Sequence, residues 1–168
     1  MNSRRQKLIE TNTKYHMVIH LVIGVFIAIF VHRLFPFSSF SKTLVLSLFG
    51  SWLPDIDHFI FFYIYGRNNE YSKIVRAFLR QFRLKEFASF AQNNHKELTG
   101  LYSHNLASTF IAALIFFVLA LDVHGYKSVT FALAITMHFI YDIVEDLLFF
   151  GHLNPNWFLR FNKPKHQL

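Results

Sequence analysis

Four long apolar stretches limit this chain more than any other feature of its sequence. They span residues 15–35, 43–65, 104–121 and 128–150. About 20 apolar residues in a helix cross the hydrocarbon core of a bilayer. Charged residues make up only 16% of the chain, against about 25% in an ordinary soluble domain. The sequence therefore predicts an all-α integral membrane bundle of four transmembrane helices, forming a single membrane domain over residues 1–168.

The basic residues predict how this bundle is oriented. Fourteen of the 17 Lys and Arg residues lie in the N-terminal arm, in segment 66–103 and in the tail after residue 150. In the four-helix topology all three segments lie on one side, and the positive-inside rule makes that side cytoplasmic. The first apolar stretch lacks the small-residue cleavage site of a signal peptide, so it is expected to be retained. Both termini are then cytoplasmic, in a protein of the inner membrane.

Segment 66–103 also carries the pattern of a basic amphipathic helix. Its apolar residues recur at three- and four-residue spacing, with Lys and Arg mostly on the other faces. The apolar positions are Ile74, Val75, Phe78, Leu79 and Phe82. Such a helix either lies on an anionic leaflet or packs against the protein's own cytoplasmic face.

The second apolar stretch is interrupted by Pro54-Asp55-Ile56-Asp57-His58. Each ionised side chain at the centre of a membrane helix costs about 3 kcal/mol, so such residues usually have a function. Aspartate and histidine together are typical ligands for zinc, manganese or iron. The chain has no cysteine, so any metal must be held by oxygen and imidazole nitrogen. The sequence therefore predicts a divalent metal site, with zinc as the first choice.

The fourth stretch offers a second set of candidate ligands. His138 and Asp142 are four residues apart and share one face of a helix, with Glu145 close to that face. A buried histidine with a structural carboxylate partner is the alternative interpretation of this pair.

Two further histidines complete the predicted site. His20 lies in the first stretch and His104 at the start of the third, whereas His16 is placed near the membrane interface without a role and His95 in the solvated loop. In the four-helix topology the candidates lie within about 15 Å of one membrane face, at about 1.5 Å of rise per residue. Scattered structural histidines would not be expected to share one leaflet. The predicted metal ligands are His20, Asp55, His58, His104, His138 and Asp142.

The order of these motifs resembles the YdjM-like family of bacterial membrane-bound metal-dependent hydrolases, over roughly residues 15–155. More distantly, it is similar to zinc-dependent phospholipase C proteins. The family usually has His-Arg-Gly-x-Thr-His where this chain has residues 99–104, so His95 or Glu145 is the alternative for the missing ligand. The motifs that carry the resemblance are His20-x-x-x-Gly24, Pro54-Asp55-Ile56-Asp57-His58, Ser103-His104, His138-x-x-x-Asp142 and Gly151.

This resemblance implies a metal-dependent hydrolase, and the residues favour a phosphoester, such as a lipid headgroup, as substrate. Asp57 or Glu145 is the predicted general base, and no Gly-x-Ser-x-Gly nucleophile motif occurs. Membrane lipids are the expected partners, and the formal charge of +7 is assigned to the membrane surface rather than to nucleic acid. The alternative is a non-enzymatic small membrane subunit or sensor with a structural or metal-binding His/Asp cluster.

Overall fold

A computed structural model describes residues 3–94, 100–121 and 125–158, and within these ranges every regular element is a helix. The long helices are α1 (Ser3–Leu34), α2 (Phe40–Trp52), α6 (Leu106–Ala120) and α7 (Tyr126–Glu145). Two shorter helices are α4 (Glu70–Arg80) and α5 (Leu84–Asn94). The short elements are η1 (Leu53–Asp55), α3 (Ile56–Ile60), η2 (Phe61–Tyr65), η4 (Asp146–Phe150) and η5 (Pro155–Trp157). The all-helical prediction is confirmed for these residues.

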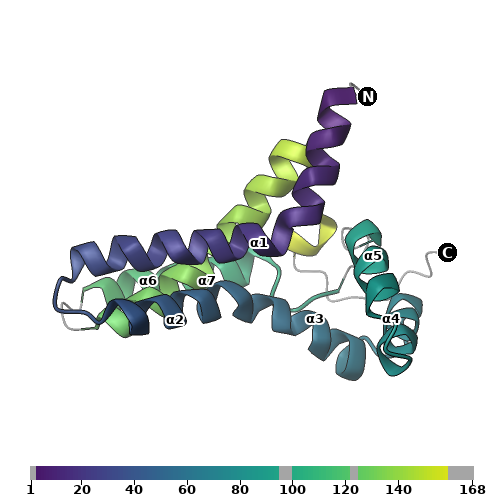
Figure 1. The fold of residues 1–168 in the computed structure, drawn as a ribbon. Coiled ribbons are helices and arrows are strands. Elements are labelled where there is room, and N and C mark those ends of the chain that lie inside the picture. The colour runs from purple at the N-terminus through teal and green to yellow at the C-terminus, as the bar shows by residue number, and fades with distance from the viewer. Residues whose placement is uncertain (1–2, 95–99, 122–124, 159–168) are drawn as a thin grey trace.

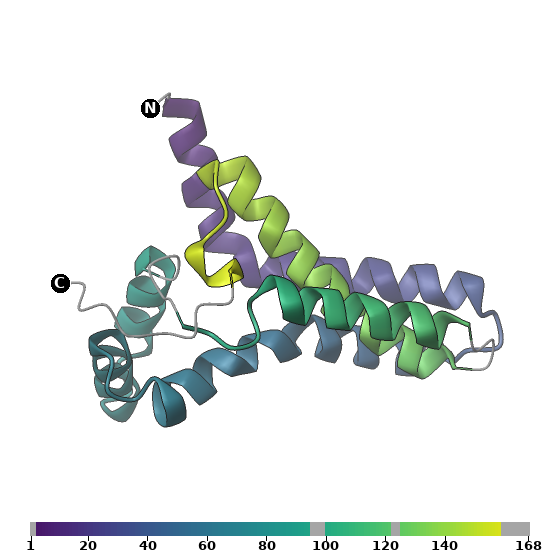
Figure 2. The ribbon, with the colours of Figure 1, turned by 180° about the vertical axis from the view of Figure 1, so that it is seen from behind.

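Helices α1, α2, α6 and α7 pack along one another, and α4 and α5 lie at one end of this bundle (Figure 1). From behind, α6 lies along α7, and the N-terminal part of α1 and the C-terminal part of α7 turn away together (Figure 2).

The surface of the bundle is apolar and its interior is small and polar. Phe26, Val45 and Phe110 are 67%, 66% and 68% exposed. The fully buried positions between the helices include Ala28, Thr43, Ser47, Thr130 and Ala134. Small and hydroxyl-bearing residues at helix contacts, with large apolar residues outside, are typical of helices that pack within a membrane.

Two helical segments, Gln6–Leu34 and Phe40–Tyr65, are long and apolar enough to cross a membrane. The apolar helix Leu106–Ala120 has only 15 residues, or about 22 Å at 1.5 Å per residue. Helix α7 reaches 20 residues but carries His138, Asp142 and Glu145 inside it. The membrane character is therefore supported, whereas the number of four transmembrane helices is not confirmed.

The first helix is longer than the predicted stretch 15–35, because it begins at Ser3 and includes the basic arm. Asn12, within that arm, is 7% exposed and donates a hydrogen bond to the Glu145 carboxylate. The arm continues as helix because it packs on α7 and η4.

The predicted interruption at Pro54 is present. Helix α2 ends at Trp52, and the chain makes a 3-10 turn over Leu53–Asp55 before α3 begins. Proline has no N–H for the helical hydrogen-bond ladder, so the regular helix stops there. The break leaves Asp55 buried at the junction.

Helix α4 packs one face against the protein itself, as one of the two alternatives for the amphipathic segment predicted. Val75 is fully buried in a cluster with Phe61, Phe62 and Leu101. Lys73 is exposed, and Phe82, one of the predicted apolar positions, lies beyond the end of α4 and is 86% exposed. The end of the bundle near α3 is thereby covered by α4 and α5.

The close contact between α2 and α7 depends on Gly50. A Cβ at this position would lie 2.9 Å from both the Ala134 Cβ and the Phe131 carbonyl oxygen. Alanine favours helix by about 1 kcal/mol over glycine, but overpacking costs about 1–3 kcal/mol. We expect Gly50→Ala to lower the thermal unfolding temperature in detergent, whereas Val45→Ala, at an exposed site on the same helix, should not. An unchanged or raised unfolding temperature for Gly50→Ala would contradict this packing.

Candidate metal centre

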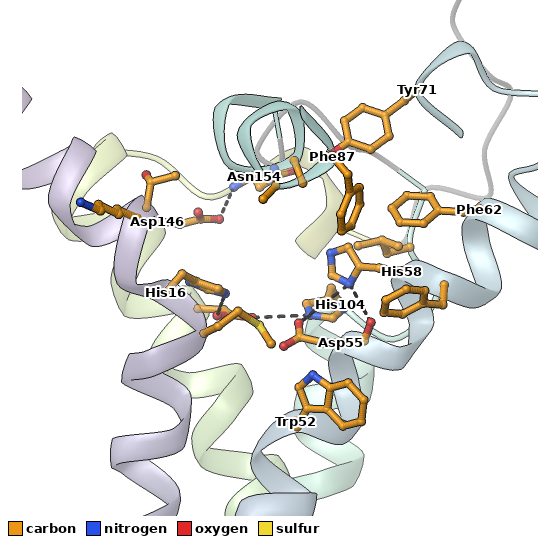
Figure 3. A pocket seen from close by; sticks show the side chains of 18 of the residues that line it. His16, Trp52, Asp55, His58, Phe62, Tyr71, Phe87, His104, Asp146 and Asn154 are labelled. Carbon is orange, nitrogen blue, oxygen red and sulfur yellow. Dashed lines mark hydrogen bonds and ion pairs between the residues drawn. The ribbon is translucent and has the colours of Figure 1, made fainter. Parts of the chain in front are cut away.

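All six predicted ligands lie together in the structure, and a seventh residue joins them. They come from four separate parts of the chain: α1, the η1–α3 junction, the segment before α6, and α7. Figure 3 shows His16, Asp55, His58 and His104 directed toward one another from these elements. The seven residues are His16, His20, Asp55, His58, His104, His138 and Asp142.

A first group of donor atoms lies between α1 and α7. The Nε2 atoms of His16 and His20 are 3.1 Å apart. Asp142 Oδ1 lies 3.1 Å from His20 Nε2 and 3.7 Å from His16 Nε2. The three side chains thus present two nitrogens and one oxygen to a common point.

A second group lies on the other side of the same aspartate. The Nε2 atoms of His104 and His138 are 3.4 Å apart, and Asp142 Oδ2 lies 3.6 and 3.3 Å from them. Asp55 Oδ1 is 3.9 Å from His104 Nε2 and 3.8 Å from His138 Nε2. His58 Nδ1 lies 3.8 Å from Asp55 Oδ1 at the edge of this group. The two oxygens of Asp142 therefore face two different pairs of histidines.

These spacings fit ligands of a divalent ion. Two ligands at about 2.0–2.1 Å from a tetrahedral zinc are about 3.3 Å apart. Facing imidazole nitrogens repel unless a proton or a cation lies between them, because both present lone pairs. Asp55 Oδ2 is buried and has no hydrogen-bond partner among the described residues. A buried carboxylate oxygen without a partner is costly, and a bound cation would satisfy it.

The outer nitrogens of His138 and His16 are held by hydrogen bonds, whereas His20 Nδ1 is buried and has no hydrogen-bond partner among the described residues. His138 Nδ1 donates to the Ser51 carbonyl at 2.7 Å, at the Pro54 break in the second apolar segment. His16 Nδ1 lies 3.1 Å from Glu145 Oε1, and Glu145 is fully buried. Each bond fixes the ring with its Nε2 lone pair toward the donor group, as partners of metal-bound histidines do.

His104 is oriented through a short relay. Its Nδ1 lies 2.9 Å from Ser103 Oγ, which donates to Asp57 Oδ2 at 2.9 Å. The Ser103 N–H also donates to Asp57 Oδ2, and the Tyr65 hydroxyl donates to Asp57 Oδ1 at 2.7 Å. Both oxygens of Asp57 therefore accept hydrogen bonds from the protein.

A cavity of about 480 Å³ opens beside the donors. Five of the candidate ligands form part of its wall: His16, Asp55, His58, His104 and Asp142. The predicted bases Asp57 and Glu145 are not among the described residues that line it. They lie behind His104 and His16, and their role as general bases stays a prediction.

His16 was predicted to lie near the membrane interface without a role, and the structure places it in the first donor group. The available signal was its four-residue spacing from His20, which puts both rings on one face of α1. Only His20 was predicted as a ligand, because Gly24 follows it four residues later and His16 lies near the expected end of the membrane span. His95, an alternative for the missing family ligand, lies outside the described residues.

Of the comparisons with known proteins, only the one with family models gave a match. The family model of the YdjM inner membrane protein matches residues 16–151, a range that includes every residue of both donor groups. No curated protein and no solved structure matches the chain. The match confirms the resemblance seen in the motifs, and its hydrolase aspect stays a prediction. The chain therefore belongs to the family of YdjM inner membrane proteins.

Proposed function

We propose that this protein is a membrane-bound, metal-dependent hydrolase of a phosphoester. The observation that carries the proposal is Asp142, whose two oxygens each face a separate pair of histidine nitrogens. A carboxylate in this position suits a bridge between two ions, and paired ions about 3.5–4 Å apart are typical of enzymes that cleave phosphoesters. Nitrogen and oxygen donors favour zinc, with manganese or iron as alternatives.

The reaction is written for a generic phosphoester. The oxygen of water forms a bond to phosphorus, the bond from phosphorus to the alcohol oxygen breaks, and the alcohol leaves with a proton. Bound divalent ions supply a water with a pKa lowered toward about 7 and polarise a phosphoryl oxygen. His16, His20 and Asp142 would hold one ion, and His104, His138, Asp55 and Asp142 the other. The cavity leaves room at the donors for the substrate phosphate.

Asp57 and Glu145 are proposed to position histidines instead of acting as general bases. Each carboxylate lies on the far side of a histidine from the donor groups, through Ser103 for Asp57 and directly for Glu145. Such outer partners fix the tautomer and raise the basicity of the ligand.

The non-enzymatic alternative is a small membrane subunit or sensor with a structural His/Asp site. A structural zinc site is closed by four protein ligands, whereas a catalytic site keeps one position open. The cavity beside His104 and Asp142 favours the open kind.

The four-helix topology is also part of the proposal. Helices α6 and α7 are proposed to cross the bilayer beside the two apolar segments, with the site near the cytoplasmic leaflet. The position of α4 and α5, which carry most of the loop's basic residues, at the same end as the site supports this orientation (Figure 1).

Metal content tests the shared role of Asp142. The purified wild-type protein, loaded with zinc, is expected to hold about two ions per chain. Asp142→Asn should lose both ions, Asp55→Asn should lose at least one, and Leu114→Ala, at a 52% exposed site on α6, should keep both. Elemental analysis and thermal unfolding in detergent measure these outcomes. A wild-type protein without metal, together with a fully tolerated Asp55→Asn, would leave the hydrolase proposal without support.

The relay to His104 is tested by metal affinity. Asp57→Asn and Ser103→Ala each remove an outer hydrogen bond, so the dissociation constant for zinc should rise about 10–100-fold. Glu86→Gln is the matched control, because Glu86 pairs with Arg83 on the surface of α5. Titration against a chelator of known affinity gives the constants. Equal affinity in all four proteins would show that Asp57 does not orient a ligand.

Orientation is tested with single cysteines, since the chain has none of its own. Asn93→Cys on α5 and Ser41→Cys at the opposite end of the bundle are both exposed. In intact cells a membrane-impermeant thiol reagent should label Ser41→Cys and should not label Asn93→Cys before lysis. The reverse labelling pattern would overturn the proposed cytoplasmic position of the site.

A further inference from the structure

The wall of the cavity beyond His58 includes aromatic and small apolar side chains. It includes Phe59 from the second apolar segment. Phe62 from the same segment and Phe87 from α5 are labelled in Figure 3. Ala88 and Ala91 of α5 also line the cavity. A volume of about 480 Å³ lies in the range of about 300–1,000 Å³ that is usual for small-molecule sites. The cavity is therefore polar at one end and apolar along the rest.

Part of the opening of the cavity is apolar as well, although the exposed Lys14 also lines the cavity. Met17 from α1 and Trp52 and Phe59 from the second segment line the cavity and are 46%, 40% and 44% exposed. All three belong to the two segments that are long and apolar enough to cross a membrane. An opening of this kind faces hydrocarbon more favourably than water. A ligand with an apolar part can therefore enter sideways from the bilayer.

The polar end suits an anionic group. Lys14 is the one lysine or arginine among the described residues that line the cavity. Asp55 and Asp142 would repel a phosphate, and divalent ions at the donor groups would reverse that repulsion. The preference for an anion therefore rests on the function proposed above, whereas the apolar wall is independent of it.

We propose that this cavity binds a phospholipid with its phosphate at the donor groups and an acyl chain along the Phe59, Phe62 and Phe87 wall. The substrate class is then a membrane lipid phosphoester, drawn laterally from the bilayer, and not a water-soluble phosphate ester. Helix α5 forms the wall that accommodates the chain, and its two alanines make the room.

The two tryptophans of the chain, Trp52 and Trp157, both line the cavity, so fluorescence reports its occupant directly. Trp157 donates through its Nε1 to Asp146 and is only 3% exposed. This burial shields its ring from lipid outside the cavity. In a Trp52→Phe protein in dodecyl maltoside micelles, phosphatidic acid with brominated acyl chains should quench Trp157 in a saturable way. Absence of saturable quenching would overturn the proposal.

Larger side chains on α5 test where the acyl chain lies in the cavity. Ala88→Phe with Ala91→Phe should raise the apparent dissociation constant about tenfold or more, because the rings occupy the space of the chain. Ser89→Phe, on a different face of α5, should leave the constant unchanged. Equal constants for the two variants would contradict the assignment of the wall.

Displacement tests the same point without altering α5. Unbrominated long-chain phosphatidic acid should restore the fluorescence of Trp157 in the Trp52→Phe protein, and glycerol 3-phosphate should not. Restoration by glycerol 3-phosphate would assign the cavity to a water-soluble ligand and overturn the lipid proposal.

Zinc separates this inference from the proposed function. Adding Zn²⁺ should tighten the binding of brominated phosphatidic acid and leave that of brominated diacylglycerol, which has no phosphate, unchanged. Quenching by both lipids with no effect of zinc would retain the chain site and reject the metal-dependent headgroup site. Zinc binding without quenching would retain the metal site and reject the chain site.

Discussion

The carboxylate of Asp142 is the interaction on which the rest of this structure depends. It lies on α7 and is shared between His20 of α1 on one side and His104 and His138 on the other. An ionised carboxylate among the helices of a membrane protein is costly unless it is paired. Four separate parts of the chain are therefore held together at the point where that charge is compensated, and the geometry of the donors suits divalent ions.

The packing of the bundle serves this arrangement. Gly24 lies against Ser47 and Ser51, and Gly50 against Phe131, so α2 fits closely between α1 and α7. Close approach through small residues is how helices associate where water provides no hydrophobic driving force. The break at Pro54 then directs Asp55 toward the donor groups and leaves the neighbouring apolar residues facing the cavity.

Much of the site followed from the sequence, because polar residues in apolar stretches are few and their helical spacing is explicit. His138 and Asp142 share a face of α7 as their spacing requires, and the interruption at Pro54 follows from its missing N–H. The sequence did not indicate which way these side chains point in the folded protein. His16 turns inward toward His20 and Glu145, while Asp57 turns toward Ser103 and Tyr65, away from the cavity. Side-chain direction at such positions depends on the partner helices, which periodicity does not specify.

The prediction of four membrane spans also went beyond what hydropathy supports, because only two helical segments are long and apolar enough to cross a membrane. Helix α6 is short, and the apolar sequence of α7 is interrupted by the residues that form the site.

The central claim is that Asp142 joins two metal ions. X-ray absorption at the zinc edge of the loaded protein tests it most directly. The account predicts nitrogen and oxygen neighbours at about 2.0–2.1 Å and a second zinc at about 3.5–4 Å. A single zinc with no metal neighbour, or no bound zinc, would contradict it.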